Sequence, residues 1–183
     1  ECIMTNAILE KLWNVNLANT EILDVSHEEG EFWDITDVPA FTRVHWKNSF
    51  GADSVILSEI WIPDDWNGRF VVCGSGGMAG ALSRPLLAVY ARQGYAAAHT
   101  NMGTGNGRPR GIGNPDVWND FGWRSTHMMA VVGKALIAEC CGKAPDYSYF
   151  LGASTGGNQA MQMVQRFPDD YDGVLAGVPA HNR

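Results

Sequence analysis

Short apolar runs recur along the chain, with turn residues between them. Three runs are rich in the β-branched and aromatic residues that favour strands: residues 20–25, 41–46 and 55–62. Four more have the length and composition of buried strands: residues 69–73, 95–100, 147–151 and 173–178. The turn-rich stretch KNSFGADS joins the second run to the third, so these two runs predict a β-hairpin.

Amphipathic stretches with helical periodicity lie between the later runs. They predict helices at residues 83–93, from Asp116 to Gly142, and from the serine-containing turn at 152–156 to Pro168. Strands that alternate with helices predict an α/β fold with a mainly parallel sheet covered on both faces. The segment 101–115 is rich in glycine and proline, which predicts an irregular, mobile loop that forms a lid or a substrate-facing rim.

Composition and length fit one globular domain over residues 1–183, with N-terminal strands in 1–54 and a core in 55–183. The chain is 45% hydrophobic and carries a net charge of −7, which argues against nucleic acid and anionic membrane as partners. The apolar stretch 128–138 is too short to cross a bilayer. The first residues lack the pattern of a signal peptide, which leaves the compartment open.

Cysteine spacing adds little chemistry to this picture. The four cysteines are Cys2, Cys73, Cys140 and Cys141. Their spacing matches neither a zinc site nor a disulfide framework, and adjacent cysteines rarely pair with each other. We therefore expect buried, unreactive thiols.

The stretch GASTG at residues 152–156 fits the G-x-S-x-G pattern, in which a strand turns sharply into a helix with a serine at the apex. It lies between a predicted strand and a predicted helix, as this turn requires. Side chains at Gly152 and Gly156 would collide where the strand and the helix meet, which explains the two glycines. Ser154 is therefore the candidate nucleophile of an acyl-transfer reaction.

A second glycine-rich stretch, residues 74–80, follows the predicted strand 69–73. It fits the dinucleotide-binding pattern G-x-G-x-x-A, but that site requires an acidic residue about twenty positions later, where this chain reads AAAHTN. An oxyanion hole is a better explanation of these glycines than a dinucleotide site. It takes one backbone N–H from such a loop and one from the residue after the nucleophile. The candidate donors are Gly76, Gly77 or Met78, together with Thr155.

Other titratable and aromatic side chains have structural interpretations. Three aspartates that follow the nucleophile helix are expected in a solvated turn: Asp169, Asp170 and Asp172. A hydrogen-bonded structural role is expected for His127, and no chemistry is assigned to three other histidines: His27, His45 and His99. His181 is an alternative for the catalytic base. Packing in the core and the loops is expected for the tryptophans: Trp61, Trp66, Trp118 and Trp123.

Four stretches resemble the tannase and feruloyl esterase family: EIWIPDDWNGRFVVCGSGGMAG, NPDVWNDFGWRSTHMMAVVGKALI, GKAPDYSYFLGASTGGNQ and QRFPDDYDGVLAGVPAHN. They span most of residues 55–182, and VPAFTRV adds a weaker match before them. The resemblance implies an α/β-hydrolase fold with Ser154 as the nucleophile. It also implies a small-molecule substrate, an ester of a phenolic acid such as gallic or hydroxycinnamic acid.

The chain departs from the family pattern at three places. The family usually has a cysteine just before the nucleophile, in a disulfide with a cysteine beside the catalytic histidine, whereas this chain has Ala153. It often has another cysteine at the position of Thr42. Without these bridges the chain fits a reducing compartment such as the cytoplasm, although the family is often secreted. The family's catalytic aspartate and histidine, and its lid domain with a bound calcium, lie beyond the segment that matches residues 173–182.

We therefore expect the amino-terminal part of a serine ester hydrolase, with an α/β-hydrolase fold that is incomplete at the C-terminus and no cofactor in this segment. The 183 residues alone are expected to be inactive, because a serine without its base is a weak nucleophile. The last strand would leave an open sheet edge, against which the missing segment or another chain could pair. The alternative is a catalytically inactive or truncated hydrolase-like module that serves in binding.

Overall fold

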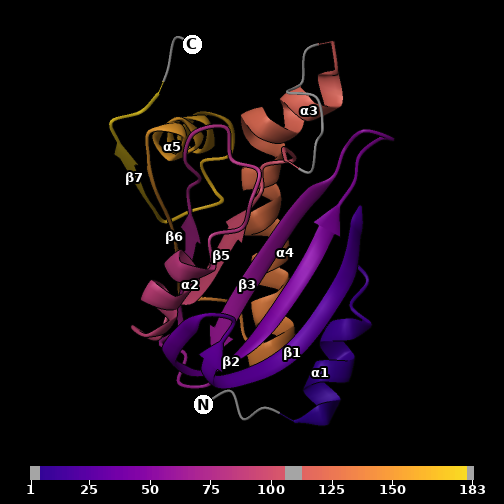
Figure 1. Ribbon diagram of the computed structural model, residues 1–183, viewed down its shortest axis with the longest axis vertical. Coiled ribbons are helices and arrows are strands. Elements are labelled where there is room, and N and C mark those ends of the chain that lie inside the picture. The colour runs from indigo at the N-terminus through magenta and orange to yellow at the C-terminus, as the bar shows by residue number, and fades with distance from the viewer. Residues whose placement is uncertain (1–4, 106–112, 181–183) are drawn as a thin grey trace.

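A seven-stranded sheet forms the centre of the computed structural model, which describes residues 5–105 and 113–180 (Figure 1). The strands are β1 (Thr20–Phe32), β2 (Ile35–Asn48), β3 (Ile56–Pro63), β4 (Arg69–Cys73), β5 (Ala96–Thr100), β6 (Tyr147–Ala153) and β7 (Gly173–Gly177). The helices are α1 (Asn6–Trp13), α2 (Arg84–Ala91), α3 (Pro115–Asn119), α4 (Ser125–Cys141), α5 (Thr155–Arg166) and the π-helical turn η1 (Asp120–Arg124).

The sheet is mixed and has the strand order β1-β2-β3-β5-β4-β6-β7. The first three neighbouring pairs are antiparallel, and the pairs β5–β4, β4–β6 and β6–β7 are parallel. The predicted hairpin between the second and third apolar runs is confirmed as the β2–β3 pair, in which Thr42 lies opposite Ile62. Because β4, β5, β6 and β7 run in one direction, they all end at the same edge of the sheet, where α/β proteins bind their ligands.

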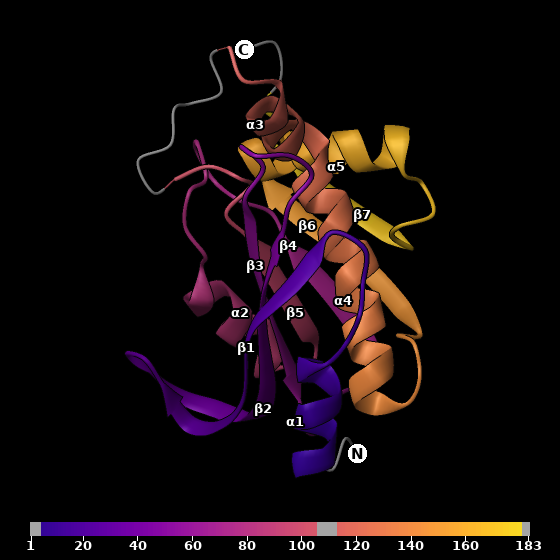
Figure 2. The same cartoon turned by 90° about the vertical axis from the view of Figure 1, so that its right-hand side faces the viewer.

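Helices cover both faces of the sheet (Figure 2). The face with α1, α4 and α5 holds the larger core, in which Phe70 and Phe150 are fully buried. The opposite face carries α2, which buries Leu87 beside the stacked rings of Phe41 and Trp61. The central strands are covered on both sides, and this explains why their sequences read as continuous apolar runs.

The N-terminal strands are longer than their apolar runs. β1 and β2 pair with each other from Thr20 opposite Asn48 to Phe32 opposite Ile35. Many positions of β1 are polar and half-exposed, so hydrophobic patterning revealed only its first part. Helix α1 precedes the sheet and was not expected; it begins after Thr5, whose hydroxyl accepts a hydrogen bond from the N–H of Ile8.

The long helix expected from Asp116 to Gly142 is divided into α3, η1 and α4. Asn114 caps the start, where its side chain accepts hydrogen bonds from the N–H groups of Asp116 and Val117. The end at Gly142 is confirmed, and its φ of 71° is the left-handed conformation typical of a helix C-cap. A π turn adds a local register shift that apolar periodicity does not reveal.

The described part of the glycine- and proline-rich loop is buried rather than mobile. Asn101 and Met102 are almost fully buried, and Thr104 is 8% exposed. Asn101 accounts for this order: its Oδ1 accepts hydrogen bonds from the N–H groups of Leu57 and Gly103, at 2.9 and 2.8 Å. The expectation of a mobile loop is therefore wrong for residues 101–105, and residues 106–112 lie outside the described part.

The expectation of unreactive thiols is correct for two cysteines and wrong for a third. Cys73 and Cys140 are free and buried, and burial raises the pKa of the Cys140 thiol to about 11. Cys141 is disulfide-bonded, and Cys2 lies outside the described residues. The expectation of a reducing compartment rested on missing disulfides, and the disulfide of Cys141 removes that support.

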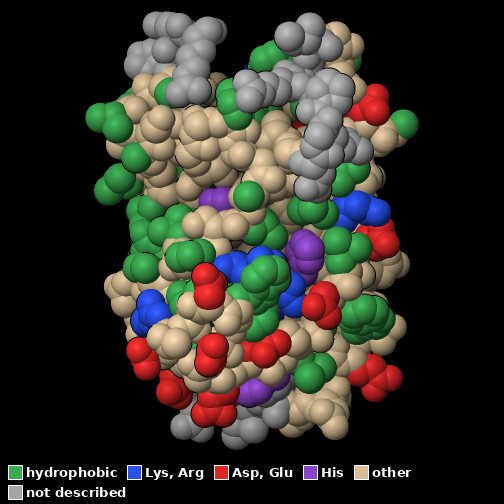
Figure 3. Space-filling model, viewed as in Figure 1, with side chains coloured by type: hydrophobic (Ala, Val, Ile, Leu, Met, Phe, Trp, Pro, Cys, Tyr) green, Lys and Arg blue, Asp and Glu red, His purple; other side chains and the backbone are tan. Residues whose placement is uncertain are grey.

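The surface is divided between an acidic region and a region with few charges (Figure 3). In this view the acidic side chains gather over the lower half of the molecule, where the N-terminal strands lie, and the end that carries α3 and α5 shows few of them. No helix within residues 5–105 and 113–180 is long and apolar enough to cross a membrane. β7 forms one edge of the sheet, and its Leu175 is 58% exposed.

Candidate active site

Ser154 occupies the sharp turn between β6 and α5, at the edge where the parallel strands end. Its φ of 57° and ψ of −116° are strained values for a residue with a side chain, as a nucleophile elbow requires. Backbone hydrogen bonds hold it there. The N–H of Ser154 donates to the carbonyl oxygen of Gly177 at 3.0 Å, and its own carbonyl accepts from the N–H groups of Asn158 and Ala180 at 3.1 and 2.9 Å.

Three glycines allow the backbone segments around Ser154 to pack in direct contact. A Cβ added to Gly152 would lie 2.7 Å from the Cα of Gly156 and closer still to its carbonyl group. A Cβ on Gly74 would lie 2.7 Å from the Cα of Gly156 and 2.9 Å from that of Gly152. The steric explanation for the two elbow glycines therefore agrees with the structure, and Gly74 joins the same contact.

The loop after β4 lies against this elbow and presents unused N–H groups. Four of its N–H groups, those of Gly74, Ser75, Ala79 and Gly80, already donate hydrogen bonds; their acceptors are Leu151 O, Gln159 Oε1, Gly76 O and Asn101 O. Within the described residues no acceptor is recorded for the N–H groups of Gly76, Gly77 and Met78. These are the three residues that the sequence singled out as oxyanion donors.

A hydrogen bond from Thr155 bears on which of these three N–H groups could contact an oxyanion. The Thr155 hydroxyl donates to the carbonyl oxygen of Gly77 at 2.6 Å. The peptide bond between Gly77 and Met78 is trans, so the N–H of Met78 points opposite to that carbonyl and away from Thr155. The N–H groups of Gly76 and Gly77 therefore remain as the candidates to act together with the N–H of Thr155.

A pocket of about 560 Å³ adjoins the elbow and the glycine loop. It is lined by Met78, Met102, Trp118, Phe121, Gly122, Thr155, Asn158, Gln159, Gln162 and Ala180. Aromatic and thioether side chains form one part of this lining, and the amide side chains of α5 supply hydrogen-bonding groups. Trp118, for which packing was expected, is 52% exposed and lines the pocket.

The π turn η1 brings Phe121 and Gly122 to the pocket, and sequence patterning missed it. Asp120 is fully buried, and its Oδ1 accepts a hydrogen bond from Arg124 Nη1 at 3.0 Å. Burial raises the pKa of the Asp120 carboxyl, against the opposing effect of Arg124. The Arg124 guanidinium also lies 4.6 Å from the ring centre of Phe50, which ties the turn to the loop before β3.

Two of the three aspartates before β7 have anchoring roles. Asp170 Oδ2 is 2.7 Å from Nδ1 of His127, whose ring stacks on Phe167. Asp172 Oδ2 accepts a hydrogen bond from the N–H of Ser148 at 2.7 Å, which joins the turn to β6. His127 is therefore a hydrogen-bonded structural residue, as expected, whereas Asp170 and Asp172 are anchors rather than members of a solvated turn.

The other described histidines also lie outside the elbow. His27 bonds to Asp64, and His99 Nδ1 accepts a hydrogen bond from the N–H of Ser83 at 3.3 Å. Burial lowers the pKa of His99 to about 4 and also lowers that of His45. Among residues 5–105 and 113–180 no histidine is hydrogen-bonded to Ser154, and His181 lies outside the described residues.

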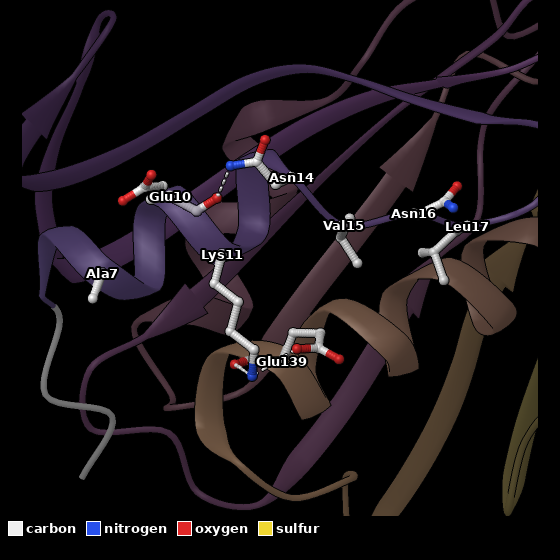
Figure 4. Close-up of a pocket in the computed structure, with 8 residues that line it drawn as sticks. All are labelled: Ala7, Glu10, Lys11, Asn14, Val15, Asn16, Leu17 and Glu139. Atoms are coloured by element: carbon white, nitrogen blue, oxygen red, sulfur yellow. Dashed lines mark hydrogen bonds and ion pairs between the residues drawn. The ribbon is translucent and has the colours of Figure 1, made fainter.

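A second pocket, of about 520 Å³, lies at the opposite end of the molecule, beside α1 (Figure 4). Lys11 and Glu139 point toward each other across it and form an ion pair at 2.7 Å. Both side chains are substantially exposed, and such surface pairs contribute little. Across the described part of the chain, no group of three or more His, Cys, Asp or Glu side chains could hold a metal ion.

The elbow, the glycine loop and the sheet together define an α/β-hydrolase. The structure superimposes on feruloyl esterase B from Aspergillus oryzae with a TM-score of 0.85 and 32% identity, over 94% of this chain and 37% of that chain. It also shares its fold with brefeldin A esterase, a bacterial homologue of human hormone-sensitive lipase, with a TM-score of 0.50 and 18% identity over 96% of this chain and 46% of that chain. The predicted fold class is confirmed.

Within that class, the chain belongs to the tannase and feruloyl esterase family, which matches residues 42–183. It is 44% identical to feruloyl esterase B from Aspergillus niger over 141 residues, which are 76% of this chain and 27% of that protein. It is 40% identical to a probable feruloyl esterase B-1 from Aspergillus oryzae over 149 residues, or 81% of this chain and 28% of that protein. The chain thus spans between a quarter and a third of the length of these relatives.

Proposed function

We propose that this chain carries the nucleophile and the oxyanion hole of a serine carboxylic ester hydrolase that acts on esters of phenolic acids. The observation that carries the proposal is the strained Ser154 beside a loop in which three N–H groups have no acceptor among the described residues. A strained backbone at Ser154 and a row of unused N–H donors both cost stability, and an acyl-transfer site needs the two together.

The reaction follows from the order of these groups. Ser154 Oγ attacks the ester carbonyl carbon, and its proton passes to a histidine base from outside the described residues. The carbonyl oxygen becomes an oxyanion, which accepts hydrogen bonds from the N–H of Thr155 and from that of Gly77 or Gly76. The alcohol leaves with the proton, and water then attacks the acyl carbon, which releases the acid and restores the Ser154 hydroxyl.

The position of Thr155 at the start of a helix also favours negative charge beside its N–H. Thr155 is the first residue of α5, and the first N–H groups of a helix lack acceptors within the helix. They also lie at the positive end of the helix dipole. The N-terminus of α5 therefore favours an oxyanion that forms at Ser154.

The pocket lining supports an aromatic acyl group. Trp118 and Phe121 offer flat apolar surfaces, and Asn158 and Gln162 offer donors and acceptors for ring hydroxyl groups. The acidic surface lies mostly at the other end of the molecule in Figure 3. The relatives named feruloyl esterase B fit the same chemistry, since ferulic acid is a hydroxycinnamic acid.

The test uses the complete protein and a Ser154→Ala variant. We expect hydrolysis of methyl ferulate or methyl gallate to exceed that of simple acetate esters, and we expect a fluorophosphonate to label the wild-type protein only. A folded wild-type protein that neither turns over esters nor reacts with the fluorophosphonate would favour the inactive binding module. Preference for acetate esters would leave Ser154 as the nucleophile and overturn the phenolic substrate class.

A further inference from the structure

Two threonine hydroxyls hold consecutive carbonyl groups of the glycine loop. Thr155 Oγ1 donates to the Gly77 carbonyl oxygen at 2.6 Å, and Thr104 Oγ1 lies 2.7 Å from that of Met78. Thr104 has one hydroxyl proton, and its other acceptor, the Asn101 carbonyl, is farther away at 3.1 Å. Both threonines are almost fully buried, and they belong to different elements, the start of α5 and the loop after β5.

The ends of the loop are hydrogen-bonded to its surroundings through the N–H groups of Gly74, Ser75 and Gly80, but its tip, residues 76–78, has little else to fix its conformation. A Cβ added to Gly76 or Gly77 would meet nothing within 4 Å, so these residues are not held by packing. Glycine also loses more conformational freedom on folding than any other residue. One internal turn, with the N–H of Ala79 bonded to the Gly76 carbonyl, is too short to fix the whole loop. The two hydroxyls therefore supply the missing constraint.

A fixed carbonyl also fixes an amide, because the peptide unit is planar. The hydroxyl of Thr155 sets the peptide between Gly77 and Met78, and that of Thr104 sets the next peptide. The peptide set by Thr104 carries the N–H of Ala79, which donates to the Gly76 carbonyl and so sets the peptide that carries the N–H of Gly77. The N–H of Gly77 is thereby held in one orientation without being occupied. Donors that need no reorganisation when charge develops are the ones that lower a barrier.

Thr104 is itself anchored to the sheet. Asn101 Nδ2 donates to the Thr104 carbonyl at 3.1 Å, and Asn101 Oδ1 accepts from the N–H of Leu57 on β3. The Asn101 carbonyl also accepts a hydrogen bond from the N–H of Gly80 at the end of the glycine loop. The hydroxyl of Thr104 therefore reaches the glycine loop from a rigid support.

We propose that the side-chain hydroxyls of Thr155 and Thr104 are positioning groups, which hold the glycine loop so that its free N–H groups meet the oxyanion formed at Ser154. This inference rests on the proposed esterase function and assigns a role to Thr104, which lies outside the expected site. Thr155 then acts twice, through its N–H as a donor and through its hydroxyl as a clamp.

The test compares isosteric substitutions in the complete protein. Thr155→Val and Thr104→Val remove a hydroxyl and keep the branched shape. Thr155→Ser and Thr104→Ser keep the hydroxyl and remove the methyl group. With methyl ferulate we expect each valine variant to lose about 10- to 100-fold in kcat with little change in KM, since small displacements of oxyanion donors cost this much. The serine variants should keep most of the wild-type kcat. Thr42→Val, a buried threonine on β2 away from the loop, is the matched control and should keep the wild-type kcat.

Two further measurements separate positioning from a general loss of stability. A trifluoromethyl ketone analogue of the substrate should bind the valine variants more weakly by the same factor as the fall in kcat/KM, while ferulate affinity stays constant. The double variant should cost less than the product of the single effects, because both hydroxyls hold one loop. Rates are counted per Ser154 titrated to completion with a fluorophosphonate, and Thr104→Ala replaces Thr104→Val if the latter does not fold.

Valine variants with a lower melting temperature and unchanged kcat per titrated site would overturn the inference while the esterase function stands. Equal losses in the serine and valine variants would also overturn it, because the hydroxyl would then not be the group that matters. A folded wild-type protein without turnover would overturn the proposed function, and this inference with it.

Discussion

Gly152→Ala tests whether the direct backbone contact at the elbow is what places Ser154. The new Cβ would lie 2.7 Å from the Cα of Gly156 and closer to its carbonyl group. These neighbours are main-chain atoms of the first turn of α5, so they cannot move aside by changing a rotamer. Either β6 or the start of α5 must shift.

The size of the effect follows from this geometry. Inserting a carbon into a packed contact costs about 1 to 3 kcal/mol when side chains can adjust, and here only backbone is available. We therefore expect a loss of unfolding free energy of at least about 2 kcal/mol. A shift of the α5 terminus by about 1 Å would also move the Thr155 N–H relative to Ser154, which costs about a hundredfold in kcat.

Chemical denaturation and turnover of methyl ferulate in the complete protein measure the two effects. Gly122→Ala is the control for stability, because a Cβ at Gly122 would meet nothing within 4 Å and alanine favours a helical turn. A Gly152→Ala protein as stable as the Gly122→Ala protein, with wild-type kcat, would refute the reasoning about the packed elbow.

The pH dependence of stability should reflect His99. Its folded pKa is about 4 and its ordinary value is 6.5, so below pH 6.5 the unfolded chain binds a proton that the folded chain does not, and stability falls toward pH 4 by about 3 kcal/mol. His99→Asn, whose Oδ1 can still accept from the Ser83 N–H, should lose this part of the slope in denaturant titrations; an unchanged slope would show that other groups cause it. Replacing the amide of Gly77 by an ester, with glycolic acid in place of the glycine, should lower kcat about a hundredfold. A full rate would point to Gly76. Phe121→Ala should raise KM for methyl ferulate about tenfold more than for acetate esters, and equal changes would remove the ring from substrate binding. Dithiothreitol should lower the melting temperature because it opens the disulfide of Cys141, and a constant value would show that this bond does not stabilise the fold.

The sequence predicted the parts of the site that depend on local chemistry. The stretch GASTG predicts the elbow because only glycine fits beside a strained serine. The apolar run before it, residues 147–151, has the composition of a buried strand. The three residues whose N–H groups have no acceptor among the described residues could also be named, because the chain lacks the acidic residue that a dinucleotide-binding glycine loop requires. The central strands and the end of the long helix at Gly142 also agree with the structure.

Several of the missed features depend on partners far away in the chain. Thr104 contacts Met78 and Asn101 contacts Leu57, and no spacing rule connects these pairs. The π turn was missed for a different reason: it continues directly from α3 into α4, and its five residues carry no pattern that distinguishes them from an α-helical turn. Trp118 reads as a packing residue until the pocket is known. The disulfide of Cys141 could not be recognised from spacing alone.

The elbow and the open edge of the sheet are mechanically connected through β7. Ser154 bonds to Gly177 at the end of this strand and to Ala180 just beyond it. A Cβ on Gly157 would lie 2.7 Å from the Cα of Pro179, so the first turn of α5 also packs directly on this segment. Among the described strands β7 pairs only with β6, and any strand that adds to its other edge would stiffen the same segment that holds the Ser154 backbone. Hydrogen bonds to β7 and to the segment after it therefore help to hold the strained backbone of Ser154, together with the glycines of the elbow. The proposed nucleophile thus depends on a part of the sheet that lies outside the G-x-S-x-G pattern.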